Sequence, residues 1–296
     1  MNEPNRIQSD SVMLYLAFGL LRTSRKLPSS MVTTDIDPTL LRISKKILSS
    51  SELKAVGEFD AETRNYVHAR ALPSPFKGKG ILILPVRLMA DVLTFLDTRR
   101  AMREPLVEAF MAVYRQRAEE ARTPLASGYN ENDYPSEAVV RRTFTFETQV
   151  WELSTPGQLK TVNRALYEQE RVKMQNVWSQ AKETITAVLL GEFQRLTGHL
   201  AERLMPGADG AKKKFAKTMV TNLTEWLELF GQRDLTDDAE LVRMVEKARA
   251  LIAGVDPETI RESDKFRQEL ASGFTALAKE VDAAVVSQAG RAINLD

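Results

Sequence analysis

The chain has 296 residues and a formal net charge of +1, with 43% apolar and 27% charged residues, a composition that argues against wholesale disorder. It has no cysteine, which excludes disulfides, thiolate zinc sites and a cysteine nucleophile. Basic and acidic residues are balanced along the chain, which is mild evidence against a nucleic-acid binder, although a local basic face remains compatible with it.

The longest continuously apolar run covers residues 12–21 and is too short to span a bilayer. Acidic residues precede this run and basic residues follow it without a small-residue cleavage site, so it does not match a signal peptide. We therefore expect a cytoplasmic protein with no membrane contact. The short run and the Ser/Pro-rich turn after it favour a strand over a helix.

Cap signals dominate the chain that follows. Asp37-Pro38 predicts a helix over residues 37–49, a capping box at Ser49 predicts a short helix to residue 56, and Asp60 can cap another to about residue 69. Each segment begins with a side chain that can accept hydrogen bonds from the free N–H groups of a first helical turn.

Two further strands and a long helical region are expected before residue 150. Residues 81–84 and 144–146 are rich in strand formers. Pro85 can open a helix that continues to about residue 122, with Pro105 interrupting or restarting it. Residues 123–135 form a loop by composition.

Residues 158–205 predict one long helix, which starts after Ser154-Thr155-Pro156-Gly157 and ends at Pro206. Apolar residues recur at a mean step of about 3.75 residues, above the 3.5 of a left-handed coiled coil, so a long heptad dimer is disfavoured. Gly191 and Gly198 weaken this helix by roughly 1 kcal/mol each relative to alanine and mark the expected bend.

Three more helical segments follow: residues 212–230, a helix capped by Thr236 that ends near residue 253, and a last helix or helix pair from Asp256-Pro257. With the long helix they predict an antiparallel bundle. The expected fold class is a predominantly helical α+β protein, with a small antiparallel sheet and helices in residues 1–153 and an elongated helical bundle in residues 154–296.

Four segments carry a resemblance to a known family: LRISKKILSSSELKAV (residues 41–56), LPSPF (72–76), ILILPVRLMADVLTFL (81–96) and LVEAFMAVY (106–114). They resemble a family of bacteriophage- and plasmid-encoded proteins of unknown function. Genes of that family often lie near one for an ATPase of the AAA class, so the resemblance implies such an ATPase as a partner. It implies no catalytic residue.

The polar, aromatic part of the loop at residues 123–135 is a candidate for recognising a partner, because loops of this length often carry function. Its candidate contact residues are Tyr129, Asn132, Asp133 and Tyr134.

The densest basic cluster is at residues 212–217. If this segment is helical, Lys213, Lys214 and Lys217 share one flank, and with Arg203 they could contact phosphates. The alternative is a solvated helix face, since no aromatic residues are interleaved to stack on bases.

No metal, cofactor or catalytic site is predicted. His68 and His199 are the only histidines, and neither has a carboxylate at a metal-ligand spacing. The function that the sequence favours is a non-enzymatic interaction or assembly protein, either a homo-oligomer or a partner of the ATPase. The alternative is a nucleic-acid-binding accessory protein that uses residues 212–217.

Overall fold

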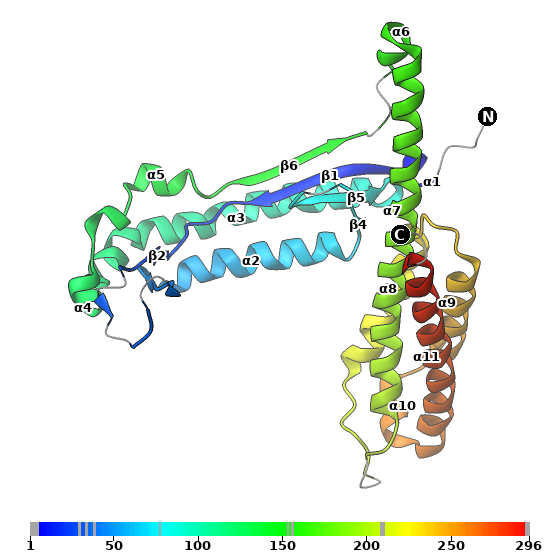
Figure 1. Ribbon diagram of the computed structural model, residues 1–296. Helices are drawn as coiled ribbons and strands as arrows, with labels where there is room; N and C mark the ends of the chain where they lie inside the picture. Colours follow the sequence, from blue (N-terminus) through cyan, green and yellow to red (C-terminus); the bar gives the residue numbers. More distant parts are fainter. Residues whose placement is uncertain are drawn as a thin grey trace. The chain divides into compact units, whose positions relative to one another are not determined.

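The computed structural model describes residues 6–28, 31–32, 35–37, 40–76, 78–152, 154, 157–207 and 211–293. It is mostly helical with a small four-stranded sheet and a two-stranded ribbon, which confirms the predicted fold class (Figure 1). Contacts group the chain into two compact units. Unit 1 comprises residues 1–14, 69–89 and 150–296, and unit 2 comprises residues 15–68 and 90–149. In this grouping, residues 1–14 and 69–89 belong with the C-terminal helices, whereas the sequence-based division places all of residues 1–153 in one domain.

The sheet contains β4 (Leu72–Pro73), β5 (Ile81–Pro85), β1 (Ser11–Phe18) and β6 (Phe146–Trp151), in that order. The predicted strands at residues 12–21 and 81–84 are confirmed by β1 and β5. The third strand begins at Phe146, later than predicted, because residues 143–145 form a turn in which the Thr145 N–H donates to the Thr143 carbonyl oxygen at 3.1 Å.

Unit 2 is built on α2 (Ser51–His68) and on α3 (Val86–Glu120), which continues into unit 2 from residue 90 onward. The prediction of two short helices at residues 49–56 and 60–69 was wrong, since α2 is continuous. Its capping residue is Ser50, whose Oγ accepts from the Leu53 N–H at 3.2 Å. Pro105 also lies inside the continuous α3, so it does not interrupt the helix.

Asp60 is a buried ion-pair partner instead of a cap. Its two carboxylate oxygens accept from Arg103 Nε at 2.7 Å and Nη2 at 2.9 Å, and both residues are at most 4% exposed. Arg103 Nη2 also donates to the carbonyl oxygen of Gly19 at 2.8 Å. Two buried charges are tolerated because they pair with each other in a bidentate geometry.

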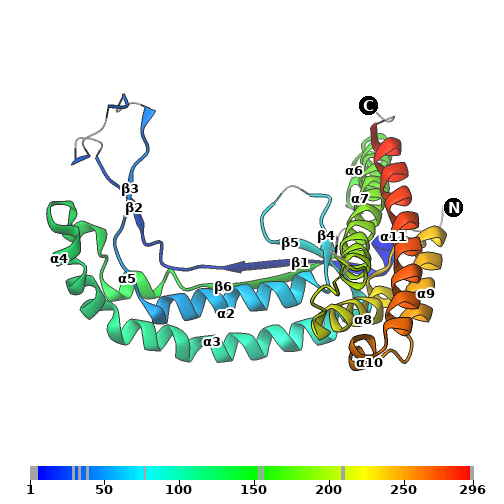
Figure 2. The ribbon, with the colours of Figure 1, turned by 90° about the horizontal axis from the view of Figure 1, so that it is seen from below.

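The predicted helix at residues 37–49 was wrong for residues 41–49, while residues 38–39 lie outside the described part of the chain. Residues 44–46 form β3 (Ser44–Lys46), which pairs antiparallel with β2 (Ser24–Lys26) in a separate two-stranded ribbon (Figure 2). The ladder continues beyond the strands, because the Leu27 N–H donates to Ile43 and the Ile47 N–H donates to Thr23, at 2.9 and 2.8 Å. Cross-strand pairing has overridden the local cap signal.

Residues 122–141 of unit 2 contain four short helical segments: α4 (Arg122–Leu125), η3 (Ala126–Gly128), η4 (Glu131–Asp133) and α5 (Glu137–Arg141). The predicted loop at residues 123–135 therefore contains three single turns of helix. The Asn130 side chain caps η4 by accepting from the Asn132 N–H at 3.0 Å.

In unit 1 the predicted single helix over residues 158–205 is divided into α6 (Leu159–Val162) and α7 (Arg164–Leu204). The break is at Asn163, which has extended backbone angles of φ −154° and ψ 104°. Its side-chain oxygen accepts from the Leu166 N–H at 3.0 Å and so caps the second helix, as asparagine commonly does.

The remaining helices of unit 1 are α8 (Lys217–Arg233), α9 (Ala239–Ile252), α10 (Pro257–Glu262) and α11 (Asp264–Ile293). The predicted Thr236 cap was wrong: Asp238 caps α9 by accepting from the N–H groups of Glu240 and Leu241. α11 runs antiparallel to α7, since Gln194 pairs with Asp282 at 2.7 Å and Arg267 Nε donates to the Leu204 carbonyl oxygen at 3.0 Å. The helical bundle is thereby confirmed.

The bundle core contains a buried polar group at the contact of α7 and α8. Arg233 is 2% exposed and makes a bidentate pair with Glu192, at 2.6 and 3.0 Å. Glu192 also accepts from the indole N–H of Trp226 at 2.7 Å, and Trp226 stacks on Phe193. Burial alone would raise the pKa of Glu192, but the hydrogen bonds and charge of Arg233 and the Trp226 hydrogen bond hold it below its ordinary value.

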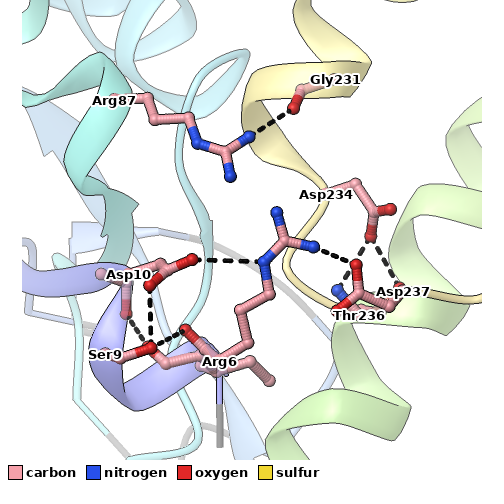
Figure 3. Close-up of polar contacts among 10 residues, drawn as sticks. Arg6, Ser9, Asp10, Arg87, Gly231, Asp234, Thr236 and Asp237 are labelled. Carbon is pink, nitrogen blue, oxygen red and sulfur yellow. Dashed lines mark hydrogen bonds and ion pairs between the residues drawn. The ribbon is translucent and has the colours of Figure 1, made fainter.

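A second polar cluster joins α1 (Arg6–Ser9) to the connection between α8 and α9 (Figure 3). Arg6 pairs with Asp10 at 3.2 Å and also with Asp237, which has a positive φ of 51°. Beside it, Asp234 accepts from both the backbone N–H and the hydroxyl of Thr236 at 2.8 Å. The Arg6–Asp237 pair holds α1 against the α8–α9 connection.

Candidate interaction surfaces

The predicted partner loop packs against the β2–β3 ribbon. The Tyr134 hydroxyl donates to the Ile47 carbonyl oxygen at 2.6 Å, and its ring stacks on Tyr129 with centroids 5.2 Å apart. Burial raises the pKa of Tyr134 to about 12. Of the four candidate residues, Asn132 is the exposed one. The rings of Tyr129 and Tyr134 are therefore packed within unit 2 and only partly available to a partner.

One face of the ribbon, here called the inner face, carries the half-buried side chains of Arg25 and Lys45. Asp133 lies against this face. Its carboxylate is 2.6 Å from Lys45 Nζ and 4.0 Å from Arg25 Nε. Lys45 also donates to the Gly128 carbonyl oxygen. Because Arg25 and Lys45 are paired across the strands, the loop neutralises one face of the ribbon and fixes its position within unit 2.

The outer face of the ribbon has the opposite character. Exposure alternates along both strands, as expected for a ribbon with one covered face, and the six exposed positions are Arg22, Ser24, Lys26, Arg42, Ser44 and Lys46. Four of the six are basic and none is apolar. This surface was not predicted from the sequence, because residues 37–49 were expected to form a helix. Side chains that share one face of a strand do not share one face of a helix.

The predicted basic flank at residues 212–217 is not a helix flank, because α8 begins only at Lys217. Lys212 forms an isolated bridge with Pro206 instead. Three of the lysines pair with carboxylates: Lys213 with Glu202 at 3.3 Å, Lys212 with Asp264 and Lys217 with Glu258. Lys214 is exposed.

Arg203, the fourth residue of the predicted phosphate-contacting set, takes part in the packing of the bundle end. Its carbonyl oxygen accepts from Arg267 Nη2 at 2.6 Å, and the same nitrogen donates to the Lys213 carbonyl oxygen at 3.0 Å. The structure therefore brings Arg203 and Lys213 together through their backbones, and acidic side chains offset much of the local positive charge.

The first half of α7 forms a third surface. Buried residues of this helix begin at Trp178, and Figure 1 shows α6 and the first turns of α7 extending past the end of α11. Leu166 is 39% exposed and Val172 is 48% exposed, while Val162 of α6 is 82% exposed. Apolar side chains therefore remain uncovered by the helices of unit 1.

Unit 2 contains an open cavity of about 250 Å³ between the end of β3 and the end of α3, lined by Lys46, Ile47, Leu48, Ser49, Arg117, Glu120, Ala121, Pro124 and Leu125. Arg117 pairs with Glu120 at 2.9 Å and Glu52 at 3.3 Å. Hydrogen bonds from Ser50, the Glu52 backbone and Arg117 lower the pKa of Glu52 to about 2. The lining is mostly apolar around one ion-paired arginine.

Within the described part of the chain, no three His, Asp or Glu side chains lie close enough together to hold a metal ion. Burial and the neighbouring Arg64 charge lower the pKa of His68, and His199 is exposed. None of the described helices combines the length and apolar character needed to cross a membrane.

Comparison of the chain with protein-family models, with curated proteins and with solved structures finds no match. The resemblance to the phage and plasmid family stays a prediction.

Proposed function

We propose that the protein is a non-enzymatic interaction protein that self-associates through the exposed first half of α7. The observation that carries this proposal is a stripe of four residues, Leu166, Glu170, Lys173 and Val177. They are spaced four, three and four positions apart, so they share one helix face. Glu170 and Lys173 pair at 2.6 Å, with side chains that are 36% and 69% exposed.

The described helices of unit 1 leave this stripe largely uncovered. Gln288 of α11 lies opposite Glu183, where its side chain donates to the carbonyl oxygen at 3.5 Å, and the buried residues of α7 begin at Trp178. Residues 166–177 occupy about 17 Å of helix before that point. A second chain can bury the side chains of this stretch.

A second copy of this chain fits the stripe because the order of its residues is self-complementary. In an antiparallel pair, Leu166 can lie opposite Val177 of the second copy while Glu170 lies opposite its Lys173. The two-fold axis then repeats each contact, as an isologous dimer requires. Apolar contacts would close both ends of the pair, with two ion pairs between them.

The expected association is weak. Only a few apolar side chains are buried, exposed ion pairs contribute about 0.2–1 kcal/mol each, and association itself costs several kcal/mol. We expect a dissociation constant on the order of 0.1–1 mM, about −5 kcal/mol, as for a transient contact. The pairing covers about three turns of helix, so it is not the long heptad dimer that the sequence disfavours.

The experiment is a charge-swap series followed by sedimentation velocity over a concentration range that reaches the millimolar level. Glu170→Lys and Lys173→Glu each replace two attractive contacts by repulsive ones and should weaken association by about 1–2 kcal/mol, roughly 5–30-fold. The double variant restores both pairs with reversed polarity and should recover association.

Two apolar variants supply the matched control. Leu166→Asp should abolish association, whereas Val172→Asp should not, because Val172 is about 240° around the helix from Leu166 and is exposed to a similar extent. A wild-type protein that stays monomeric at the highest concentration, or a double charge swap that fails to recover, would contradict the proposal. An ATPase partner remains the prediction of the family resemblance alone.

A further inference from the structure

We propose that the outer face of the β2–β3 ribbon binds the phosphate backbone of duplex DNA. This surface lies in unit 2 and is separate from the α7 stripe. Its basic side chains are Arg22, Lys26, Arg42 and Lys46, all exposed. DNA binding by this surface does not depend on self-association through α7, so either proposal can be wrong while the other holds.

The ribbon spaces its charges evenly. The register pairs Ser24 with Lys46 and Lys26 with Ser44, so the four basic residues alternate between the two strands. Each step along the ribbon is two residues, about 6.8 Å. This is close to twice the axial rise of about 3.4 Å per phosphate on one DNA strand. The four charges therefore form a line of about 20 Å along the ribbon.

The charges are available for a ligand. Lys46 Nζ is 3.4 Å from the Ser49 hydroxyl, and among the described residues no carboxylate lies within ion-pair distance of any of the four basic side chains. By contrast, Arg25 and Lys45 on the inner face are neutralised by Asp133. Ser24 and Ser44, between the basic residues, offer hydroxyl groups that can donate to phosphate oxygens.

The shape favours a duplex. A two-stranded antiparallel ribbon has the width that the major groove admits. The outer face carries no aromatic side chain, which a non-specific single-strand binder would use to stack on bases. It also carries no apolar side chain to enter a bilayer. The connecting segment does expose four apolar side chains, Met31, Val32, Ile36 and Leu40. Asp35 and Asp37 of the same segment are also exposed and oppose contact with an anionic membrane.

The test is fluorescence polarisation with a labelled mixed-sequence duplex of about 20 base pairs, two helical turns. Four phosphate contacts give a slope of about −3.6 in a plot of log affinity against log salt, an approximately 150-fold loss between about 50 and 200 mM salt. Replacing Arg22, Lys26, Arg42 and Lys46 together by glutamine should bring that slope close to zero.

The control removes four charges elsewhere. Replacing Lys212, Lys213, Lys214 and Lys217 by glutamine gives the same net charge change, and it should leave duplex affinity within about twofold of wild type while keeping most of the salt slope. A second variant, Ser24→Glu with Ser44→Glu, adds two carboxylates to the outer face and should also weaken binding. Thermal unfolding of each variant verifies that the ribbon is intact.

Several outcomes would overturn the proposal. One is the absence of duplex binding by the wild type at about 50 mM salt. Another is equal weakening by the ribbon and the control variants, which would assign binding to net charge. The third is preference for another polyanion: tighter binding to the single strand of the same sequence, or to vesicles of equal parts phosphatidylserine and phosphatidylcholine.

Discussion

Replacing Gly191 and Gly198 by alanine should stabilise the protein. Both lie inside α7, and a Cβ built at either position meets no atom within 4 Å. Alanine therefore adds no clash, while it removes the conformational freedom that glycine retains in the unfolded chain. The gain is about 0.5–1 kcal/mol per site, or about 1–2 kcal/mol for the double variant.

Gly273 of α11 is the matched control. A Cβ at this position would lie 2.5 Å from Leu251 Cδ2 on α9, so the leucine side chain must move and the same helical gain is offset by strain. We expect Gly273→Ala to be neutral or destabilising. The contrast between the glycines separates helix propensity from packing.

Tryptophan fluorescence during thermal unfolding measures this effect in unit 1, because Trp151, Trp178 and Trp226 all belong to that unit. For a domain of 150–250 residues, 1 kcal/mol corresponds to about 2–4 °C in Tm, so the double variant should gain about 2–8 °C. Loss of stability in either single variant would instead identify that glycine as a packing contact. Hydrogen exchange around both sites then reports whether the wild-type glycines soften α7 locally.

Three further predictions follow from buried and hydrogen-bonded groups. Arg233→Met leaves the Glu192 carboxylate without its bidentate partner and should cost about 3 kcal/mol in urea unfolding, most of which Glu192→Leu in the same chain should recover; no recovery would contradict the pairing. Gly19→Ala places a Cβ 2.2 Å from the Thr143 carbonyl oxygen and should destabilise unit 2 by about 1–3 kcal/mol, measured by circular dichroism; an unchanged midpoint would refute this close approach. The pKa of Glu52 falls from its usual 4.5 to about 2, so its ionised form contributes stability that is fully present above the ordinary value and is lost as the pH falls toward 2. The difference in unfolding midpoint between wild type and Glu52→Gln should therefore shrink over that range, and a constant difference would contradict it.

Local sequence signals located most of the helices but not their breaks. The strand at β1 was predictable because residues 12–21 form a short apolar run, and the bundle was predictable from the periodic apolar residues of α7 to α11. The break at Asn163 was missed, since asparagine in a periodic pattern gives no sign that its side chain will cap the helix after it. At Pro105 the error was the opposite: an interruption was expected, but α3 continues through it. The helix tolerates the loss of the backbone hydrogen bond that a proline cannot donate.

The interaction surfaces were harder to predict than the fold. Residues 44–46 follow a strong cap signal at Asp37-Pro38, and only their pairing with residues 24–26, far away in sequence, makes them a strand. The lysines at residues 212–217 form a dense cluster in the sequence, yet Glu202, Asp264 and Glu258 come from other helices to pair with three of them. Charge balance of this kind depends on tertiary contacts, which a composition count does not contain.

Disulfide cross-linking tests whether the protein self-associates through antiparallel α7 helices. The chain has no cysteine of its own, so Leu166→Cys and Val177→Cys can be made as two separate single-cysteine proteins. A disulfide needs Cα atoms within about 7 Å, whereas residues 166 and 177 are about 17 Å apart along the helix. In the proposed dimer, two Leu166→Cys chains hold their cysteines far apart, and so do two Val177→Cys chains. Only a dimer of one Leu166→Cys chain with one Val177→Cys chain places the two cysteines opposite each other. We expect a covalent dimer on oxidation of the mixture and none from either protein alone; dimers of Leu166→Cys alone, or no dimer in the mixture, would contradict the antiparallel pairing.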